Sequence, residues 1–472
     1  MTKHKIIGFA IGPIGSAILG FISLPLITWF FSIEDIGRIS MLQVTVSFMI
    51  LLFCLGLDQA YVREYHGSTN RAALLKACTI PGLALMLLSL TSIYLINPTL
   101  ISEWLYDLPS STLTIATITC FILTFLSRFL ALVVRMEERA VAYSMSQLLP
   151  KILFLAFIIS IVWLGFSKDF YSLIFAHTLS IIATFTIFLW NTKNSWVQSI
   201  TCQVTRSQQS SLLSFGLPLV IGGLASWGLN VMDRLFLRQL SSFEELGVYS
   251  VTMSIAGAAT IFAGIFNTIW APMVFRWINE DDNVDLDIID KIAEHLLAVI
   301  YFITVLAGIF SWILPYFLPD QYSAIQYLII PCLLAPLFYT LSETTAVGIA
   351  ISRKTKLSMI ASIVAMLVNA VGNYLLIPKI GAAGAAISTA FAFWVFYILR
   401  TEFSRRVWRN IPSKKTYFII TLLLINTIIN TLVIQEHILG IILWLCLGVA
   451  GYFWFSSSIS LLMNKVYSLY GK

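Results

Sequence analysis

The sequence has little charge, no long polar segment and no paired cysteines, and each shortage excludes a class of protein. Only 11% of the 472 residues are charged and 58% are apolar, whereas soluble domains carry about 25% charged and about 45–50% apolar residues. A soluble core could not bury so much apolar surface, so lipid must cover part of it. The longest polar segment, near residues 191–211, is too short to fold as a domain of its own. The composition therefore predicts an integral membrane protein without a soluble catalytic domain.

The six cysteines are scattered, and none stands at CxxC spacing. They indicate neither a zinc site nor a disulfide framework, and we interpret them as packing residues. The sequence also has no HExxH motif and no clustered His/Asp pair, so we expect no metal, no cofactor and no catalytic residue. The net charge of +6 does not indicate a nucleic-acid partner, because the Lys and Arg residues stand in short loops between apolar runs.

Long apolar runs are what the sequence has in abundance. A membrane-spanning helix needs about 20 mostly apolar residues. The first run is too long for a cleavable signal peptide, so we interpret it as a span. Runs of this kind predict about fourteen spans, near residues 6–31, 39–61, 77–96, 112–134, 143–164, 170–190, 212–237, 247–272, 292–314, 323–350, 357–377, 384–401, 416–434 and 438–463.

The distribution of Lys and Arg predicts the orientation of these spans. If the N-terminus is cytoplasmic, 22 Lys and Arg residues lie in cytoplasmic segments, including a cluster from Arg400 to Lys415. Only four lie on the opposite side: Arg38, Lys168, Arg238 and Lys379. Because cytoplasmic loops carry the excess of positive charge, we expect both termini in the cytoplasm.

A self-similarity about 210 residues apart predicts two related halves. SIEDIGRIS at 32–40 matches SFEELGVYS at 242–250, and each lies between two predicted spans, where its serine would cap the following helix. An offset of six spans preserves orientation, so the repeat is parallel. We therefore predict an all-α membrane fold with two six-helix lobes around a central cleft and two extra C-terminal helices. The predicted parts are an N-lobe at 1–211, a C-lobe at 212–410, and the last two spans with a short tail at 411–472.

Two segments carry a resemblance to a known family. GLDQAYVREY at 56–65 and NVMDRLFLRQLSSFEELGVYSV at 230–251 resemble the Wzx-type O-antigen and polysaccharide flippases of the multidrug/oligosaccharidyl-lipid/polysaccharide (MOP) exporter superfamily. The most specific part is Asp233–Arg234, followed by a short acidic loop that ends in Gly-x-Tyr. The resemblance implies a flippase in the bacterial inner (plasma) membrane. Its substrate would be an undecaprenyl-pyrophosphate-linked oligosaccharide for O-antigen or capsule, hence for lipopolysaccharide or other surface polysaccharide. The protein would move this substrate from the cytoplasmic to the periplasmic leaflet by alternating access.

Ionisable side chains inside spans are the candidate site residues, because a charge at the bilayer centre costs about 2.5–3.5 kcal/mol or more without a partner. For binding of the substrate headgroup we single out Lys151, Arg128, Arg234, Asn369 and Asn373. For gating or ion coupling we single out Glu343, Asp233 and Asp58.

Each of these residues also has a structural interpretation. Lys151, Glu343 and the neighbours Asp233 and Arg234 could form ion pairs within one lobe, and Arg128 could extend its side chain to the membrane interface. Asp58 could cap a helix, and the asparagines could join helices. Under the repeat, Arg128 and Glu343 have similar depth in opposite lobes, so we predict a gate salt bridge between them.

The expected partners are the lipid-linked oligosaccharide, membrane lipids, and the polysaccharide polymerase and chain-length proteins. Coupling to an H⁺ or Na⁺ gradient, or to the membrane potential, is left open. Two other functions also remain open. The first is another MOP-type transporter, either a cation-coupled drug exporter or a lipid II flippase. The second is a membrane enzyme of polysaccharide assembly, a polymerase or an acyltransferase.

Overall fold

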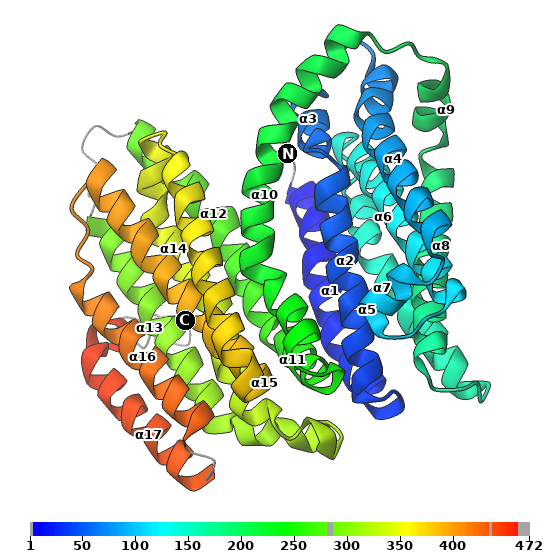
Figure 1. Cartoon of the computed structure of the whole chain (residues 1–472). Helices are drawn as coiled ribbons and strands as arrows, with labels where there is room; N and C mark the ends of the chain where they lie inside the picture. The colour runs from blue at the N-terminus through cyan, green and yellow to red at the C-terminus, as the bar shows by residue number, and fades with distance from the viewer. Residues whose placement is uncertain (1–2, 281–286, 434–436, 461–472) are drawn as a thin grey trace. The chain divides into compact units, whose positions relative to one another are not determined.

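The computed structural model describes residues 3–280, 287–433 and 437–460, and every regular element in these residues is a helix (Figure 1). The chain divides into two compact units, Met1–Trp227 and Gly228–Lys472. The division falls inside α10, a single helix of 35 residues, and the predicted lobes 1–211 and 212–410 stay a prediction. The helices of the first unit are α1 (Lys3–Phe30), α2 (Ile33–Phe53), α3 (Leu57–Glu64), α4 (Arg71–Ile96), α5 (Leu100–Tyr106), α6 (Ser111–Met136), α7 (Ala140–Trp163), α8 (Phe170–Asn191), α9 (Lys193–Thr201) and the first part of α10 (Arg206–Leu240).

The second unit is built around α14 and the long α15, which pack against each other along their lengths (Figure 1). The last helix belongs to this unit, because the indole of Trp444 on α17 is fully buried against α13 at Gly308, where an added Cβ would lie 2.3 Å from the ring. The helices after α10 are α11 (Phe243–Ala256), α12 (Ala258–Glu280), α13 (Asp287–Phe310), the 3₁₀ helices η1 (Ser311–Phe317) and η2 (Asp320–Tyr322), α14 (Ile325–Ile351), α15 (Lys356–Val407), α16 (Lys414–Leu432) and α17 (His437–Trp454).

Eleven helices in the described ranges are long and apolar enough to cross a membrane. This confirms the predicted all-α multi-pass membrane protein, whereas the number fourteen stays a prediction. One of the eleven, α15, covers two predicted spans, 357–377 and 384–401. Its backbone leaves the helical conformation between them, at Ile380 and at Gly381, whose φ is +52°. The last predicted span runs to 463, and residues 461–463 lie outside the described part of the chain.

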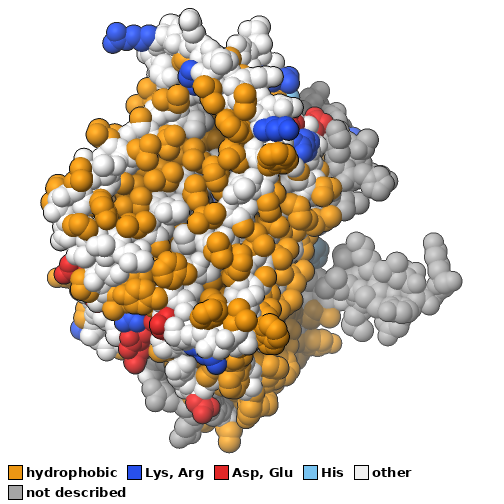
Figure 2. Space-filling model, turned by 90° about the vertical axis from the view of Figure 1, so that its right-hand side faces the viewer, with side chains coloured by type: hydrophobic (Ala, Val, Ile, Leu, Met, Phe, Trp, Pro, Cys, Tyr) orange, Lys and Arg blue, Asp and Glu red, His pale blue; other side chains and the backbone are white. Residues whose placement is uncertain are grey.

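The surface agrees with a membrane environment. In the view of Figure 2, hydrophobic side chains cover the middle of the molecule, while the Lys, Arg, Asp and Glu side chains gather toward its upper and lower ends. A band of this kind matches the hydrocarbon layer of a bilayer, whose polar borders accept charged side chains.

The two copies of the repeat begin their helices in the same way. The Ser32 hydroxyl accepts a hydrogen bond from the Asp35 backbone N–H at 3.1 Å, and the Ser242 hydroxyl accepts one from the Glu245 N–H at 3.2 Å. Each serine is the N-cap of its helix, α2 or α11, which confirms the predicted caps. The helices begin directly after the serines, several residues before the spans that hydropathy places there, because polar first turns lower the apolar signal without interrupting the helix.

Candidate functional site

Arg128 and Asp58 form an ion pair inside the first unit. The Arg128 Nη2 on α6 donates to the Asp58 Oδ2 on α3 across 2.9 Å. The Asp58 side chain is only 13% exposed, whereas that of Arg128 is 41% exposed. Arg128 therefore neutralises a nearly buried carboxylate and still presents part of its guanidinium at the surface of the unit.

A break after α2 places Asp58 at this position. Leu55 and Gly56 have φ values of +53° and +68°, which turn the chain so that α3 begins at Leu57. Gly56 also lies against α10, where an added Cβ would come within 2.1 Å of the Gly216 carbonyl oxygen. Only glycine fits both conditions, because it has no Cβ and tolerates positive φ. The predicted span 39–61 therefore ends near Phe53, and Asp58 stands in the first turn of a separate short helix.

Lys151 lies in the middle of α7, on the face that packs against α1. Its Nζ donates to the Ser16 backbone carbonyl at 2.7 Å. In the described part of the chain no carboxylate is within ion-pair distance of Lys151. The charge is thus exposed on an apolar helix and is bonded to a neutral carbonyl.

Glycines on α1 create the space for this contact. An added Cβ at Gly12 would lie 2.9 Å from the Ser144 Cα, and one at Gly20 would lie 3.4 Å from the Lys151 Nζ. The Gly12 backbone N–H also donates to the Ser144 hydroxyl at 3.0 Å. Small residues let membrane helices approach closely enough for such polar contacts, so the α1–α7 packing determines where the ammonium lies.

The second unit contains a buried polar network around Asp233 on α10. Its carboxylate is 1% exposed and accepts hydrogen bonds from the Tyr249 hydroxyl at 2.6 Å and from the Asn373 Nδ2 at 2.8 Å. Asn373 also donates to the Asn369 amide oxygen, and Asn369 donates to the Thr389 hydroxyl at 3.1 Å. Helices α10 and α11 and both halves of α15 thus meet at one buried carboxylate, whose hydrogen-bond partners in the described residues are neutral.

This network changes how two predicted headgroup ligands are understood. Asn369 and Asn373 share one helix face, as their spacing predicts, but both are fully buried. Direct contact with a sugar would require these buried side chains to become accessible. The structure therefore favours a role in positioning Asp233. The neighbouring Arg234 has its Nε buried without a hydrogen-bond partner in the described residues.

Glu343 on α14 pairs with Arg400 on α15, also inside the second unit. The Arg400 Nη1 donates to the Glu343 Oε1 at 2.6 Å and to the Ser342 hydroxyl at 2.7 Å. The guanidinium lies 5.0 Å from the centre of the Phe396 ring. Arg400 is a buried residue of α15 rather than of a loop, and its position on the cytoplasmic side stays a prediction. Here Arg128 and Glu343 each have a partner within their own unit, and the gate between them stays a prediction.

Three partners of the candidate residues escaped sequence reasoning. Tyr249 was noted only as the end of the Gly-x-Tyr motif, and Thr389 and Arg400 were not connected with any site. A weak signal exists for Arg400, because it stands at the end of an apolar run of aromatic residues, FAFWVFYILR. Among the described residues, no group of three or more His, Cys, Asp or Glu side chains could hold a metal ion.

The fold and its charged residues within helices define a multi-pass membrane protein, and comparisons with known proteins show which fold and family it has. The structure described as "Lipid II flippase MurJ, inward closed conformation" has a TM-score of 0.71 and 17% identity, over 97% of this chain and 100% of that one. An inward-facing multidrug resistance MATE family transporter of the MOP superfamily has a TM-score of 0.58 and 17% identity, over 83% of this chain and 94% of that one. At this identity the likenesses show the fold, which is that of MOP transporters.

The family follows from the sequence. A family model described as "Polysaccharide biosynthesis protein" matches residues 3–277, more than half of the chain. The chain therefore belongs to this polysaccharide biosynthesis protein family. Both segments that carried the resemblance, 56–65 and 230–251, lie in the matched region, and the resemblance is confirmed at the level of the polysaccharide biosynthesis family, with a fold like that of MOP transporters. A search of curated proteins found no match.

Proposed function

We propose that this protein is a flippase that moves undecaprenyl-pyrophosphate-linked oligosaccharide units for O-antigen or capsule, from the cytoplasmic to the periplasmic leaflet of the bacterial inner membrane. The observation that carries the proposal is the combination of a polysaccharide-biosynthesis family match with a fold shared over 97% of the chain with a lipid II flippase. Alternating access by the two repeat-related halves would provide the movement, with both termini in the cytoplasm.

The chemistry of the site supports an anionic headgroup. Arg128 and Lys151 present partly or fully exposed cations on helices of one unit, and neither charge is fully used by its protein contacts. A guanidinium suits phosphate oxygens because it offers two parallel donors, and an ammonium adds a point charge. A cationic drug would meet repulsion at Lys151, whose charge has no carboxylate partner in the described residues, so the drug-exporter alternative is less well supported.

A reconstituted transport assay tests the proposal. The purified protein would be placed in vesicles that contain undecaprenyl-pyrophosphate linked to a fluorescently labelled sugar, and a membrane-impermeant reductant would be added outside. We expect the reductant to bleach nearly all the label with the wild-type protein, but only the outer-leaflet share in empty vesicles. The same share with the protein present would contradict the proposal.

The same vesicles, with other substrates or readouts, test the alternative functions. Labelled lipid II in place of the sugar lipid tests the lipid II flippase, which the fold similarity favours as the second candidate. Uptake of a cationic dye tests the drug exporter. Release of free sugar, or growth of the glycan on the lipid carrier, would indicate an enzyme. In cells, co-purification with the polysaccharide polymerase and chain-length proteins tests the proposed partners.

We further propose that Asp233 couples transport to an H⁺ or Na⁺ gradient. It is a buried carboxylate whose hydrogen-bond partners are neutral, and such a group is costly in a membrane span unless a cation joins it. In the vesicle assay, an imposed pH or Na⁺ gradient should accelerate flipping by the wild-type protein. Asp233→Asn should remove the acceleration. If instead only the membrane potential accelerates flipping, and does so equally in the wild type and in Asp233→Asn, then Asp233 is not the coupling residue.

A further inference from the structure

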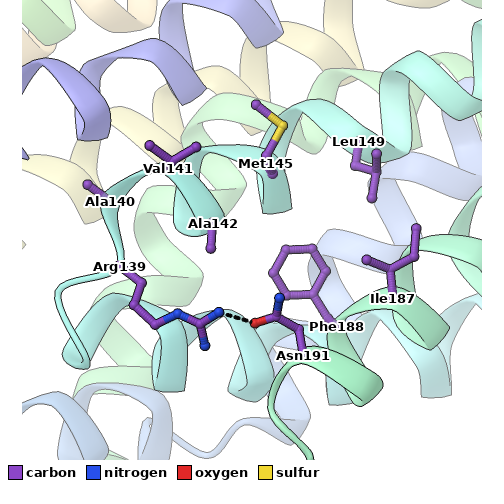
Figure 3. A pocket seen from close by; sticks show the side chains of 9 residues that line it. All are labelled: Arg139, Ala140, Val141, Ala142, Met145, Leu149, Ile187, Phe188 and Asn191. Carbon is purple, nitrogen blue, oxygen red and sulfur yellow. Dashed lines mark hydrogen bonds between the residues drawn. The ribbon is translucent and has the colours of Figure 1, made fainter.

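A groove between α7 and α8 in the first unit is separate from the candidate site. It encloses about 590 Å³, and Figure 3 shows its lining side chains. Ser144, Leu148 and Lys151 of α7 face α1, whereas the groove lies on another face of the same helix. Its apolar walls consist of Val141, Ala142, Met145, Leu149, Ile187 and Phe188.

The polar groups of the groove are confined to one end. There Arg139, the residue before α7, donates to the Asn191 amide oxygen at 2.5 Å (Figure 3). It also donates to the Glu137 carboxylate at 3.3 Å. These bonds use two of the five N–H donors of the guanidinium, and the side chain is 40% exposed. The bonds hold the guanidinium at the mouth of the groove and leave donors available to a ligand.

The same end has further features that favour an anion. Arg139 is the N-cap of α7 and makes no side-chain capping bond, so the first N–H groups of this 24-residue helix add partial positive charge at the mouth. Lys193 and Arg135 stand nearby in sequence, beyond α8 and in the last turn of α6. Glu137 and Glu138 oppose them, but the Glu137 carboxylate is engaged by Arg139 and by the Ser195 hydroxyl.

The position of this end also matches a membrane border. Trp190, in the last turn of α8, is 75% exposed, and the Lys193 ammonium lies 4.8 Å from the centre of its ring. Exposed tryptophan beside lysine is typical of the headgroup level of a bilayer. The charge pattern predicts that this border is cytoplasmic, where the leaflet is rich in anionic lipid.

We propose that the groove binds one anionic phospholipid, with an acyl chain against the apolar walls and the phosphate on Arg139. The α7–α8 groove provides the two environments that such a molecule requires, in the correct order along the helix. Residues 139–149 span about 15 Å of helix at 1.5 Å per residue, so the apolar part runs inward from the cationic end toward the hydrocarbon layer.

Native mass spectrometry of the full-length protein tests this binding. Phosphatidylglycerol and phosphatidylcholine with identical acyl chains would be titrated separately onto the purified protein. We expect phosphatidylglycerol to be retained more strongly, and Arg139→Gln to weaken its retention about tenfold, because a charge-assisted hydrogen bond to phosphate is lost. Arg206→Gln, the same change at an exposed arginine outside the groove, should leave retention unchanged.

Two further variants distinguish a specific site from a loss of folding. Ala142→Leu should fill the groove and weaken retention while keeping Arg139, and Arg139→Lys should keep most of the binding because it preserves the charge. The helical content and elution volume of each variant would be compared with the wild type. Equal retention of the two lipids, or unchanged binding in both Arg139→Gln and Ala142→Leu, would overturn the proposal. Displacement of phosphatidylglycerol by undecaprenyl phosphate would overturn it too, since the groove would then accept the carrier lipid.

Discussion

At the scale of single residues, the Arg128–Asp58 pair poses a question that one substitution cannot answer. Removal of Arg128 deletes a possible headgroup ligand and also leaves Asp58, which is nearly buried, without its cation. Breaking such a pair costs about 3–5 kcal/mol when the remaining charge is buried. We therefore expect Arg128→Gln to abolish export of surface glycan and also to lower the amount of protein in the membrane.

The double variant Arg128→Gln with Asp58→Asn separates the two effects. It removes both charges, so the protein level should recover, as measured by immunoblot of the membrane fraction. If Arg128 binds the headgroup, glycan export stays absent in the double variant. Recovery of export together with the protein level would show that Arg128 serves only as the partner of Asp58.

The Glu343–Arg400 pair supports a second prediction at this scale. Arg400 is buried and holds the carboxylate through a bond of 2.6 Å. Arg400→Gln should lower the thermal midpoint of the purified protein, because it leaves Glu343 without a cation, and Glu343→Gln added to it should restore most of the loss. A Glu343→Gln variant as stable as the wild type but inactive in flipping would instead support the predicted role of Glu343 in gating or ion coupling.

At the scale of elements, the packing of α1 on α7 depends on glycine. Gly12→Ala would place a Cβ 2.9 Å from the Ser144 Cα, a backbone atom that cannot move aside. We expect a loss of about 1–3 kcal/mol, as for other overpacked contacts, seen as a lower thermal midpoint and as reduced flipping, because the Lys151 contact with Ser16 depends on the same packing.

Gly222 on α10 is the matched control for this substitution. An added Cβ there meets no atom within 4 Å, and alanine is favoured over glycine inside a helix. Gly222→Ala should therefore leave stability unchanged or raise it slightly. Equal destabilisation by the two substitutions would show that helix propensity or expression, and not the close α1–α7 contact, explains the effect.

At the scale of the whole molecule, the excess of Lys and Arg on one side predicts the topology. Single cysteines in place of Asp320 and Arg353, both exposed, should react differently with a membrane-impermeant thiol reagent in intact cells whose outer membrane is permeable. We expect labelling at 320 in intact cells, and labelling at 353 only after the inner membrane is opened.

Native Cys202 provides an internal control for this experiment. It lies between α9 and α10, on the predicted cytoplasmic side, and is partly accessible in the structure. Cys446 is exposed as well, so Cys202 would be read in a Cys446→Ser variant, where it should behave like position 353, and the variants at 320 and 353 would carry both Cys202→Ser and Cys446→Ser. Labelling of position 353 or of Cys202 in intact cells would reverse the predicted orientation.

The sequence by itself determined the features that depend on local interactions or on the solvent. The apolar runs show that lipid must cover the helices, because moving apolar surface out of water is favourable whichever apolar surroundings it enters. The caps at Ser32 and Ser242 were also predictable, because each hydroxyl bonds a backbone N–H only three residues away. The shared face of Asn369 and Asn373 follows in the same way from helical spacing.

The tertiary structure decided which charge meets which partner. Asp58 and Arg128 are 70 residues apart in the chain, Asp233 and Asn373 are 140 apart, and Glu343 and Arg400 are 57 apart. Hydropathy treats every charged side chain inside a span alike, because it assigns each one the same cost of burial whether or not an oppositely charged side chain lies nearby. The partner depends on helix rotation and on breaks such as those at Gly56 and Gly381, and these follow from side-chain packing across helices. For this reason the sequence could identify the candidate residues, whereas only the folded helices could join them into an Arg128–Asp58 pair, an Asp233 network and a buried Glu343–Arg400 pair.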